Sequence, residues 1–433
     1  MRKVLWLGDA GCHTGFGTVT HAIGERLVRD YGHDVHVLAV NWRGDHWDTN
    51  LKLYLPHQKV PTDIYGQSRF VEMLATVEPE VVVMLNDPFV VAKFLFKNNW
   101  DSEKILLQYR PILAYMPIDG TNQPVSWSIL KRVTEPVLMS EFGRTWAPKA
   151  EVVPHGVDTE QYRPAKMRPL QSSGGSVVKN RADAKRALGY DPDRFLVVRV
   201  DRNSRRKDFA STWKALVPVM KRHPDIDVHF HCKPSGEDGV ELPQLYSREP
   251  ELADRFFSPG DHNTHTGWKR EDLAILYNAA DLVVSTSWGE GFGLTLAEAA
   301  ACGAPVIAQN VSSITEVVGP GGVLIEPAGT ITVTSGEDQW LPDIPAFTEA
   351  IEHLYAAGGV RRKLGEAGVD HIRRHFSWDD AAKAFDRIIE RLASTSENGD
   401  GDAGTAADGA PPAGSVQDHV GPAEGLHQGR RGR

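Results

Sequence analysis

Short apolar runs and amphipathic stretches alternate along most of the chain. The apolar runs suit strands that are buried on both faces, and the stretches between them repeat apolar residues at helical spacing. In the segment 18–29, for example, Val19, Ile23 and Leu27 fall on one face of a helix. This pattern predicts parallel sheets with helical crossovers, which is an α/β fold. Strands are expected at 4–7, 35–40, 80–85, 112–118 and 137–140, and then at 195–201, 228–232, 282–285, 306–308 and 322–326.

Two breaks in this pattern divide the chain. The run 171–176, rich in Gln, Ser and Gly, indicates a flexible linker, and 433 residues are enough for two domains with separate cores. After residue 393 the composition shifts to Gly, Ala, Asp and Pro, so the tail 394–433 is expected to be disordered. We predict a first Rossmann-like domain at 1–166, a linker at 167–189, a second Rossmann-like domain at 190–377 and a final helix at 378–393.

Composition and charge restrict the class of protein. The formal net charge of −9 gives no support for broad nucleic-acid binding. The widely separated Cys12, Cys232 and Cys302 indicate reduced thiols without a metal-binding spacing. The sequence shows no signal peptide and no run long enough to span a membrane, so we expect a soluble, cytoplasmic protein. An aromatic-rich stretch at 89–100 leaves peripheral membrane contact open, although its two lysines and its length favour a helix that faces the core.

The stretch 287–308 carries the strongest chemical signal. A glycine-bearing turn at 289–293 follows an apolar strand, and an Ala-rich helix is expected at 294–302. Such a turn lies at the carboxyl end of a parallel strand, where open α/β sheets bind ligands. The backbone amides of residues 291–294 would point outward at the positive end of the helix, which favours an anion such as a phosphate.

Two acids flank the start of this helix. Glu290 lies in the turn and Glu298 follows eight positions later, a separation of roughly 12 Å if every intervening residue were helical. One carboxylate could accept hydrogen bonds from a sugar and the other from a ribose, while the helix amides hold the phosphates. The alternative is that Glu290 only stabilises the helix N-terminus and that Glu298 is solvated.

A basic cluster follows the strand expected at 195–201. Arg202, Arg206 and Lys207 belong to this loop, and a solvated run of charge is one explanation for it. Because the loop is predicted at the same sheet edge as the Glu290 turn, these cations also suit a departing diphosphate.

The string E-G-F-G-L-x-x-x-E-A at 290–299, with G-x-P-V-I at 303–307, resembles the retaining family-4 glycosyltransferases. The resemblance covers about residues 1–393 and implies the GT-B fold, in which two Rossmann-like domains face each other across a cleft. The first domain would bind the acceptor, the second would bind a nucleotide-sugar donor, and the helix 378–393 would cross back onto the first domain.

The resemblance also implies roles for single residues. The family's Arg and Lys pair falls on Arg202 and Lys207, with Arg206 as the substitute if the loop register differs. Asp119 stands at a strand end where the family usually has a histidine near the reacting sugar, and it either positions the acceptor hydroxyl or caps the turn. The implied catalytic residues are Glu290, Arg202, Lys207 and Asp119.

The implied donor-binding residues come from four segments. Two glycines lie in a loop before the first helix, where the backbone can approach the donor phosphates, and Thr266 lies in a loop that resembles the nucleobase-holding loop of the family. The full set is Gly15, Gly17, Arg202, Lys207, Thr266, Glu290, Gly291, Phe292, Gly293, Leu294 and Glu298.

The implied activity is transfer of a sugar from a nucleotide diphosphate sugar to an acceptor hydroxyl, with retention at the anomeric carbon. The acceptor stays open between a lipid, a glycan, a small metabolite and a protein. No metal and no other cofactor are expected, because the basic loop and the helix amides would meet the charge on the leaving diphosphate. Two alternatives stay open: a nucleotide-sugar epimerase on the same fold, which the spaced acid pair argues against, and a nucleotide-sugar-binding scaffold without catalysis.

Two other sites are disfavoured. The glycines of the segment 8–17 do not fit G-x-G-x-x-G, and Asn41 stands where a dinucleotide site would have a ribose-binding acid. The D-x-D string at 225–227 precedes its strand and lies at the edge opposite to the ligand edge, so we expect a turn there and no metal site.

Overall fold

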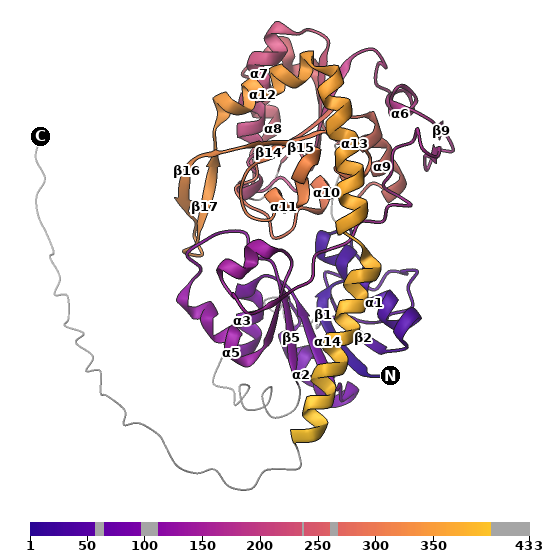
Figure 1. The fold of residues 1–433 in the computed structure, drawn as a ribbon, viewed down its shortest axis with the longest axis vertical. Helices are drawn as coiled ribbons and strands as arrows, with labels where there is room; N and C mark the ends of the chain where they lie inside the picture. The colour runs from indigo at the N-terminus through magenta and orange to yellow at the C-terminus, as the bar shows by residue number, and fades with distance from the viewer. Residues whose placement is uncertain (57–64, 97–110, 236–237, 260–266, 400–433) are drawn as a thin grey trace, which may run out of the picture.

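The computed structural model describes residues 1–56, 65–96, 111–235, 238–259 and 267–399. Within these ranges the chain forms two α/β domains, each built on a parallel sheet. Figure 1 shows the N-terminal half as the lower lobe and most of the C-terminal half as the upper lobe. The last helix, drawn in yellow, returns from the upper lobe and runs along the lower one.

The first domain contains a seven-stranded parallel sheet in the order β3-β2-β1-β4-β5-β6-β7. The chain leaves β1 in one direction toward β2 and in the other toward β4, so the carboxyl ends of β1 and β4 form the switch point where such sheets bind ligands. The strands are β1 (Lys3–Asp9), β2 (Asp34–Val40), β3 (Lys52–Tyr54), β4 (Val81–Leu85), β5 (Ile112–Met116), β6 (Glu135–Leu138) and β7 (Glu151–Val152). The helices are α1 (Gly15–Tyr31), α2 (Gln67–Val77), α3 (Pro88–Phe96) and α5 (Leu130–Val133), with 3-10 turns η1 (Val125–Ile129) and η2 (Glu141–Thr145).

The second domain contains a six-stranded parallel sheet in the order β12-β11-β10-β13-β14-β15, with its switch point between β10 and β13. The strands are β10 (Phe195–Val200), β11 (Ile226–His231), β12 (Phe256–Phe257), β13 (Leu282–Ser285), β14 (Val306–Gln309) and β15 (Gly322–Ile325). The α-helices are α6 (Arg181–Ala187), α7 (Phe209–Arg222), α8 (Leu242–Tyr246), α9 (Arg270–Ala279), α10 (Leu294–Ala301), α11 (Ile314–Val318), α12 (Ile344–Ala356) and α13 (Gly358–His375). Three 3-10 turns, η3 (Arg205–Lys207), η4 (Pro250–Arg255) and η5 (Gly319–Gly321), complete the domain.

Two antiparallel hairpins lie outside these sheets. The first, β8 (Leu170–Gln171) with β9 (Val177–Val178), forms within the segment expected to be a flexible linker, which therefore has local structure. The second, β16 (Pro327–Thr332) with β17 (Asp338–Pro342), forms within a polar stretch whose sequence predicted no definite element. Figure 1 shows this second hairpin extending from the upper lobe down to the lower lobe.

The last helix, α14 (Trp378–Gly399), packs on the first domain. Its Phe385 is fully buried, stacks on Trp6 with ring centroids 5.6 Å apart and meets the edge of Tyr115. Burying a side chain of this size contributes about 1.5–3 kcal/mol, so this contact helps to hold the two domains together. The helix continues past residue 393 into the segment expected to be disordered, and residues 400–433 lie outside the described part of the chain.

Two local predictions were wrong. Helix α1 begins at Gly15 rather than at residue 18, because the Thr14 hydroxyl caps it by accepting a hydrogen bond from the amide of Gly17 at 3.0 Å. The D-x-D string is not a separate turn, since β11 already begins at Ile226, and the carboxylate of Asp227 forms a two-pronged ion pair with Arg194.

Candidate active site

The Glu290 turn is fixed by its own backbone contacts. Gly293 has φ = +97°, a left-handed conformation that glycine adopts without strain just before α10 begins. The amide of Glu290 donates to the Ser312 hydroxyl at 2.9 Å, and the Ser313 hydroxyl donates to the carbonyl oxygens of Glu290 and Phe292 at 2.7 and 2.9 Å. The turn therefore holds a defined shape at the carboxyl end of β13.

The side chain of Glu290 lies between two cations. Its Oε1 is 2.5 Å from Lys207 Nζ and its Oε2 is 3.3 Å from a terminal nitrogen of Arg206. Only 7% of Glu290 is exposed. Burial alone would raise the pKa of Glu290, but attraction to Lys207 and Arg206 outweighs it and lowers the pKa to about 2. Glu290 is therefore a carboxylate at neutral pH.

Both cations have a second acidic partner. Lys207 Nζ is 2.6 Å from the Oδ1 of Asp201, which follows β10, and Arg206 Nε is 3.3 Å from the Oδ2 of Asp119 in the first domain. Burial would lower the pKa of Arg206, but the nearby Glu290 and Asp119 carboxylates raise it. The 3-10 turn η3 thus connects acids of both domains through neighbouring cations.

The two domains touch directly at this point. A β-carbon on Gly289 would lie 1.9 Å from the carbonyl oxygen of Asp119, and one on Gly291 would lie 2.1 Å from the Cβ of Pro117. Real β-carbons do not approach so closely, and only glycine fits at both positions in this closed arrangement. The glycines of the motif thus allow the loop after β5 to rest on the Glu290 turn.

The structure brings together Lys207, Glu290 and Asp119 of the residues implied as catalytic, whereas Arg202 is exposed and makes no ion pair among the described residues. Arg206, expected only as a substitute, contacts both Glu290 and Asp119. The position of η3 explains this difference. Its consecutive residues Arg206 and Lys207, four and five positions after Arg202, both turn their side chains toward Glu290.

The predicted donor-binding residues are placed as follows. Gly15 lies in the first turn of α1, where a β-carbon would be 3.8 Å from a methyl group of Leu294 across the domain interface, and Gly17 packs on the carbonyl of Cys12. Phe292 is buried against the ring of His155. Thr266 lies outside the described residues.

Glu298 lies on α10 in a different environment from Glu290. It is half-buried, and the hydroxyl of Tyr277 donates to its Oε2 at 3.3 Å. Burial raises the pKa of Glu298 to about 7, although Arg270 and the neighbouring tyrosines act in the opposite direction. The two acids of the motif therefore differ in charge state near neutral pH.

Sequence reasoning missed two further polar residues beside Asp119. Glu337 and Gln339 come from the β16–β17 hairpin, and the amide of Gln339 donates to the Oδ1 of Asp119 at 3.4 Å. The alternation of Thr and apolar residues at 330–333, followed by Ser335-Gly336, is a hairpin signal that could have located this element. No local signal shows that its tip meets the first domain.

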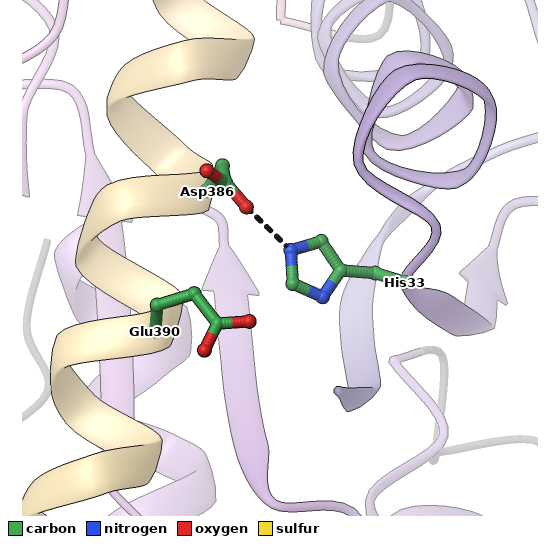
Figure 2. Close-up of side chains that lie close together, drawn as sticks. All are labelled: His33, Asp386 and Glu390. Atoms are coloured by element: carbon green, nitrogen blue, oxygen red, sulfur yellow. Dashed lines mark hydrogen bonds and ion pairs between the residues drawn. The ribbon is translucent and has the colours of Figure 1, made fainter. Parts of the chain in front are cut away.

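A separate group with metal-binding side chains joins α14 to the first domain. Ligand atoms of His33, Asp386 and Glu390 lie within 4.8 Å of one another, and Figure 2 shows His33 pointing at the helix that carries the two acids. The backbone amide of Arg2 donates to His33 Nδ1 at 3.1 Å, so Nε2 carries the proton and donates to Asp386 at 2.8 Å. Arg2 also pairs with Glu390 at 3.0 Å. These interactions explain the group as an ion-pair network that anchors α14.

A family model matches most of the second domain. Residues 194–357 match the model described as "Glycosyl transferases group 1". The chain is 30% identical over 237 residues to the D-inositol 3-phosphate glycosyltransferase of Segniliparus rotundus, covering 54% of this chain and 45% of that protein. It is 27% identical over 243 residues to the lipopolysaccharide core biosynthesis mannosyltransferase LpsB of Rhizobium meliloti, covering 56% and 60%. The chain thus spans about half the length of the curated relatives it matches.

Two solved structures with the same architecture each match 91% of this chain. Sucrose-phosphate synthase from Thermosynechococcus elongatus matches with a TM-score of 0.66 at 20% identity, covering 91% of this chain and 100% of that one. HepE from Anabaena, solved with UDP and glucose, matches with a TM-score of 0.60 at 19% identity and the same coverage. At these identities the likeness shows the fold, and it confirms the predicted GT-B architecture of two Rossmann-like domains. Among the described residues, no helix is both long and apolar enough to cross a membrane.

Proposed function

We propose that the protein, whose residues 194–357 match the glycosyl transferases group 1 model, moves a sugar from a nucleotide diphosphate sugar to an acceptor hydroxyl. The proposal includes retention of configuration at the anomeric carbon. The observation that carries it is the contact of Lys207 and Arg206 with Glu290, directly before the N-terminus of α10. Two cations and a set of outward amides at one sheet edge suit a diphosphate that gains charge as it leaves.

The residues divide the work between the two domains. Lys207, Arg206 and the amides at the start of α10 would bind the diphosphate, and Glu290 would orient these cations and accept hydrogen bonds from the sugar. Glu298 would face the ribose. The carboxyl edge of the first sheet, which includes Asp119, would hold the acceptor hydroxyl close to the anomeric carbon. The complex of HepE with UDP and glucose makes a uridine nucleotide a reasonable first donor to test.

The reaction balances without a separate base. The bond from the anomeric carbon to the diphosphate oxygen breaks, the bond to the acceptor oxygen forms on the same face, and the leaving diphosphate takes the acceptor proton. Cations around the diphosphate would stabilise its developing charge, so the proposal requires no metal ion. Contact between the domains at Gly289 and Gly291 would exclude water, which otherwise hydrolyses the donor.

The first experiment is thermal unfolding of the protein with UDP, GDP, ADP or dTDP at millimolar concentration. A nucleotide present at 100 times its dissociation constant stabilises the folded state by about 2.7 kcal/mol, which raises the unfolding midpoint measurably. We expect one nucleotide to give a clearly larger shift than the others, with and without EDTA. Loss of this shift in EDTA would contradict metal-independent binding.

Turnover then separates the alternatives. NMR of the corresponding nucleotide sugars should show a product with retained anomeric configuration only when an acceptor is added. Myo-inositol and D-inositol 3-phosphate are suitable first acceptors, since the latter appears in the names of relatives. Conversion of the donor sugar without any acceptor would indicate an epimerase, and nucleotide binding without turnover in a broad acceptor screen would indicate a scaffold.

A further inference from the structure

Three carboxylates line the ligand edge of the first sheet. Asp9 ends β1, Asp87 follows β4 by two residues, and Asp119 follows β5 by three. These strands are neighbours in the sheet, with β4 between β1 and β5, so the three acids project from adjacent strand ends. Any acceptor bound at this edge meets them.

The β16–β17 hairpin brings a fourth acid to this edge from the second domain. Thr121 and Asp338 exchange two backbone hydrogen bonds of 2.8 and 2.9 Å, which join the hairpin to the loop after β5. A β-carbon on Gly120 would lie 3.3 Å from the Cγ atoms of both Glu337 and Gln339. Glu337 and Gln339 flank Asp338 in the strand, so their side chains lie on the face of the hairpin opposite to that of Asp338. This face is the one that meets the loop after β5. Glu337 thus lies beside Asp119.

Two of these four acids, the buried Glu337 and the half-buried Asp87, have carboxylate oxygens without a hydrogen-bond partner among the described residues. Glu337 is 7% exposed, and its Oε1 accepts from the Ser335 hydroxyl at 3.1 Å, but its Oε2 has no hydrogen-bond donor within the described ranges. The carboxylate of Asp87 accepts no hydrogen bond and makes no ion pair with any described residue. Neither acid is among the residues with a fully enclosed, unpartnered oxygen, so these oxygens are open to the donor groups of a bound molecule.

The charge state of these acids agrees with this geometry. Burial and the nearby Asp119 raise the pKa of Glu337 to about 7, and the same two causes raise the pKa of Asp87 to about 6. Arg206 is already engaged by Asp119 and Glu290, and the exposed Arg202 acts on Asp9 and Asp87. A further negative charge beside Glu337 would be repelled, whereas a hydroxyl would donate to its free carboxylate oxygen.

We propose that the β16–β17 hairpin is a specificity element that places Glu337 on the acceptor side, where Glu337 and Asp87 bind hydroxyl groups of an uncharged, polyhydroxylated acceptor and exclude phosphorylated ones. The inference rests on the proposed function and adds the chemical class of the acceptor. It also assigns an acceptor-binding residue to the domain that binds the donor.

The test compares acceptors that differ only in a phosphate. The donor is the sugar conjugate of the nucleotide selected by thermal unfolding, and the assay measures release of that nucleotide. The acceptor pairs are myo-inositol against D-inositol 3-phosphate, and methyl α-glucoside against its 6-phosphate. For the wild type we expect kcat/KM at least about tenfold higher with an uncharged member than with its phosphate ester. Preference for the phosphorylated members, or no release with either uncharged probe, would overturn the inference.

The variant Glu337→Gln then tests the residue. It should raise the KM of the uncharged acceptor by about tenfold and reduce the discrimination against the phosphate, while the donor KM stays unchanged. Glu326→Gln is the matched control, because it removes the same charge from an exposed position at the base of the same hairpin. If Glu337→Gln fails to fold, Glu337→Asp replaces it and should raise the acceptor KM by a smaller factor. Acceptor kinetics equal to those of Glu326→Gln would overturn the assignment of Glu337.

The two proposals fail in different ways. Absence of any nucleotide-induced shift in the wild type contradicts the proposed function itself. A clear nucleotide shift, together with turnover of phosphorylated acceptors only, leaves the proposed function standing and overturns the acceptor class.

Discussion

Replacing Lys207 by methionine tests the electrostatic core of the candidate site. The substitution keeps the length of the side chain and leaves Glu290 and Asp201, both nearly buried, without their shared cation. Lowering the pKa of Glu290 from its ordinary 4.5 to about 2 corresponds to about 3 kcal/mol of stability. Removing one partner of a buried ion pair costs about 3–5 kcal/mol in comparable cases. Lys207 is the largest of the attractions that lower this pKa and Arg206 remains in the variant, so we expect Lys207→Met to lose up to about 3 kcal/mol at pH 7.

The loss should depend on pH in a defined direction. A carboxylate whose pKa is lowered on folding stabilises the protein fully above its unfolded pKa, and this contribution disappears as the pH falls through the folded value. The difference between wild type and Lys207→Met should thus be full above pH 4.5 and shrink as the pH approaches 2. Urea unfolding at several pH values measures it.

Lys214→Met is the control for this variant, since Lys214 is an exposed residue of α7 and makes no ion pair with any described residue. At neutral pH a loss of 3 kcal/mol corresponds to a midpoint lowered by about 6–12 °C for a domain of this size. Lys207→Met should also lose most of the nucleotide-induced shift, whereas Lys214→Met should retain it. Equal stabilities of the two variants across the pH series would refute the assignment of a buried, mutually stabilising pair.

Two further predictions concern the motif. Gly291→Ala would place a β-carbon 2.1 Å from Pro117, so it should destabilise the closed protein by about 1–3 kcal/mol in thermal unfolding. Gly329→Ala is the control and should change stability little, because nothing lies within 4 Å of a β-carbon there. Equal effects of the two variants would contradict the interdomain contact. The pKa of Glu298 is raised from 4.5 to about 7, so the wild type should lose about 3 kcal/mol of stability as the pH rises from 4.5 to 8. Glu298→Gln should not show this loss in urea unfolding, and parallel curves for the two proteins would contradict the raised pKa.

The sequence predicted the elements of the second domain closely because their signals are local. The strand β13 has the predicted bounds, and α10 ends one residue before the predicted 302. An apolar run of β-branched residues and a helical period of 3.6 are each decided within a few neighbours. The shift of α1 to Gly15 shows the limit of this reasoning, because a hydrogen bond from the Gly17 amide to the Thr14 hydroxyl moved the boundary by three residues. The GT-B fold, which a motif of the same local kind predicted, was confirmed by the solved structures, and residues 194–357 match the glycosyl transferases group 1 model.

The relation between the domains could not be predicted in this way. Arg206 lies 87 residues from Asp119, and Thr121 lies 217 residues from Asp338, so neither contact leaves a periodic trace in the sequence. Both depend on how the hairpin and the η3 turn are oriented after their own domain has folded. The acidic composition of the ligand edge of the first sheet, with a fourth acid supplied by the other domain, therefore became visible only in the structure.

Under the proposed function, the cations of the η3 loop would connect the closed arrangement to donor binding. In this structure Arg206 bridges Glu290 of the second domain and Asp119 of the first, and Lys207 bridges Glu290 and Asp201. A diphosphate at the start of α10 would compete with these carboxylates for the same two cations, because each has a limited number of donors. A shift of Arg206 toward the diphosphate would weaken its ion pair with Asp119. The Asp119 carboxylate would then be free to accept a hydrogen bond from the hydroxyl of the acceptor. Donor binding in the second domain would thus prepare the acceptor edge of the first.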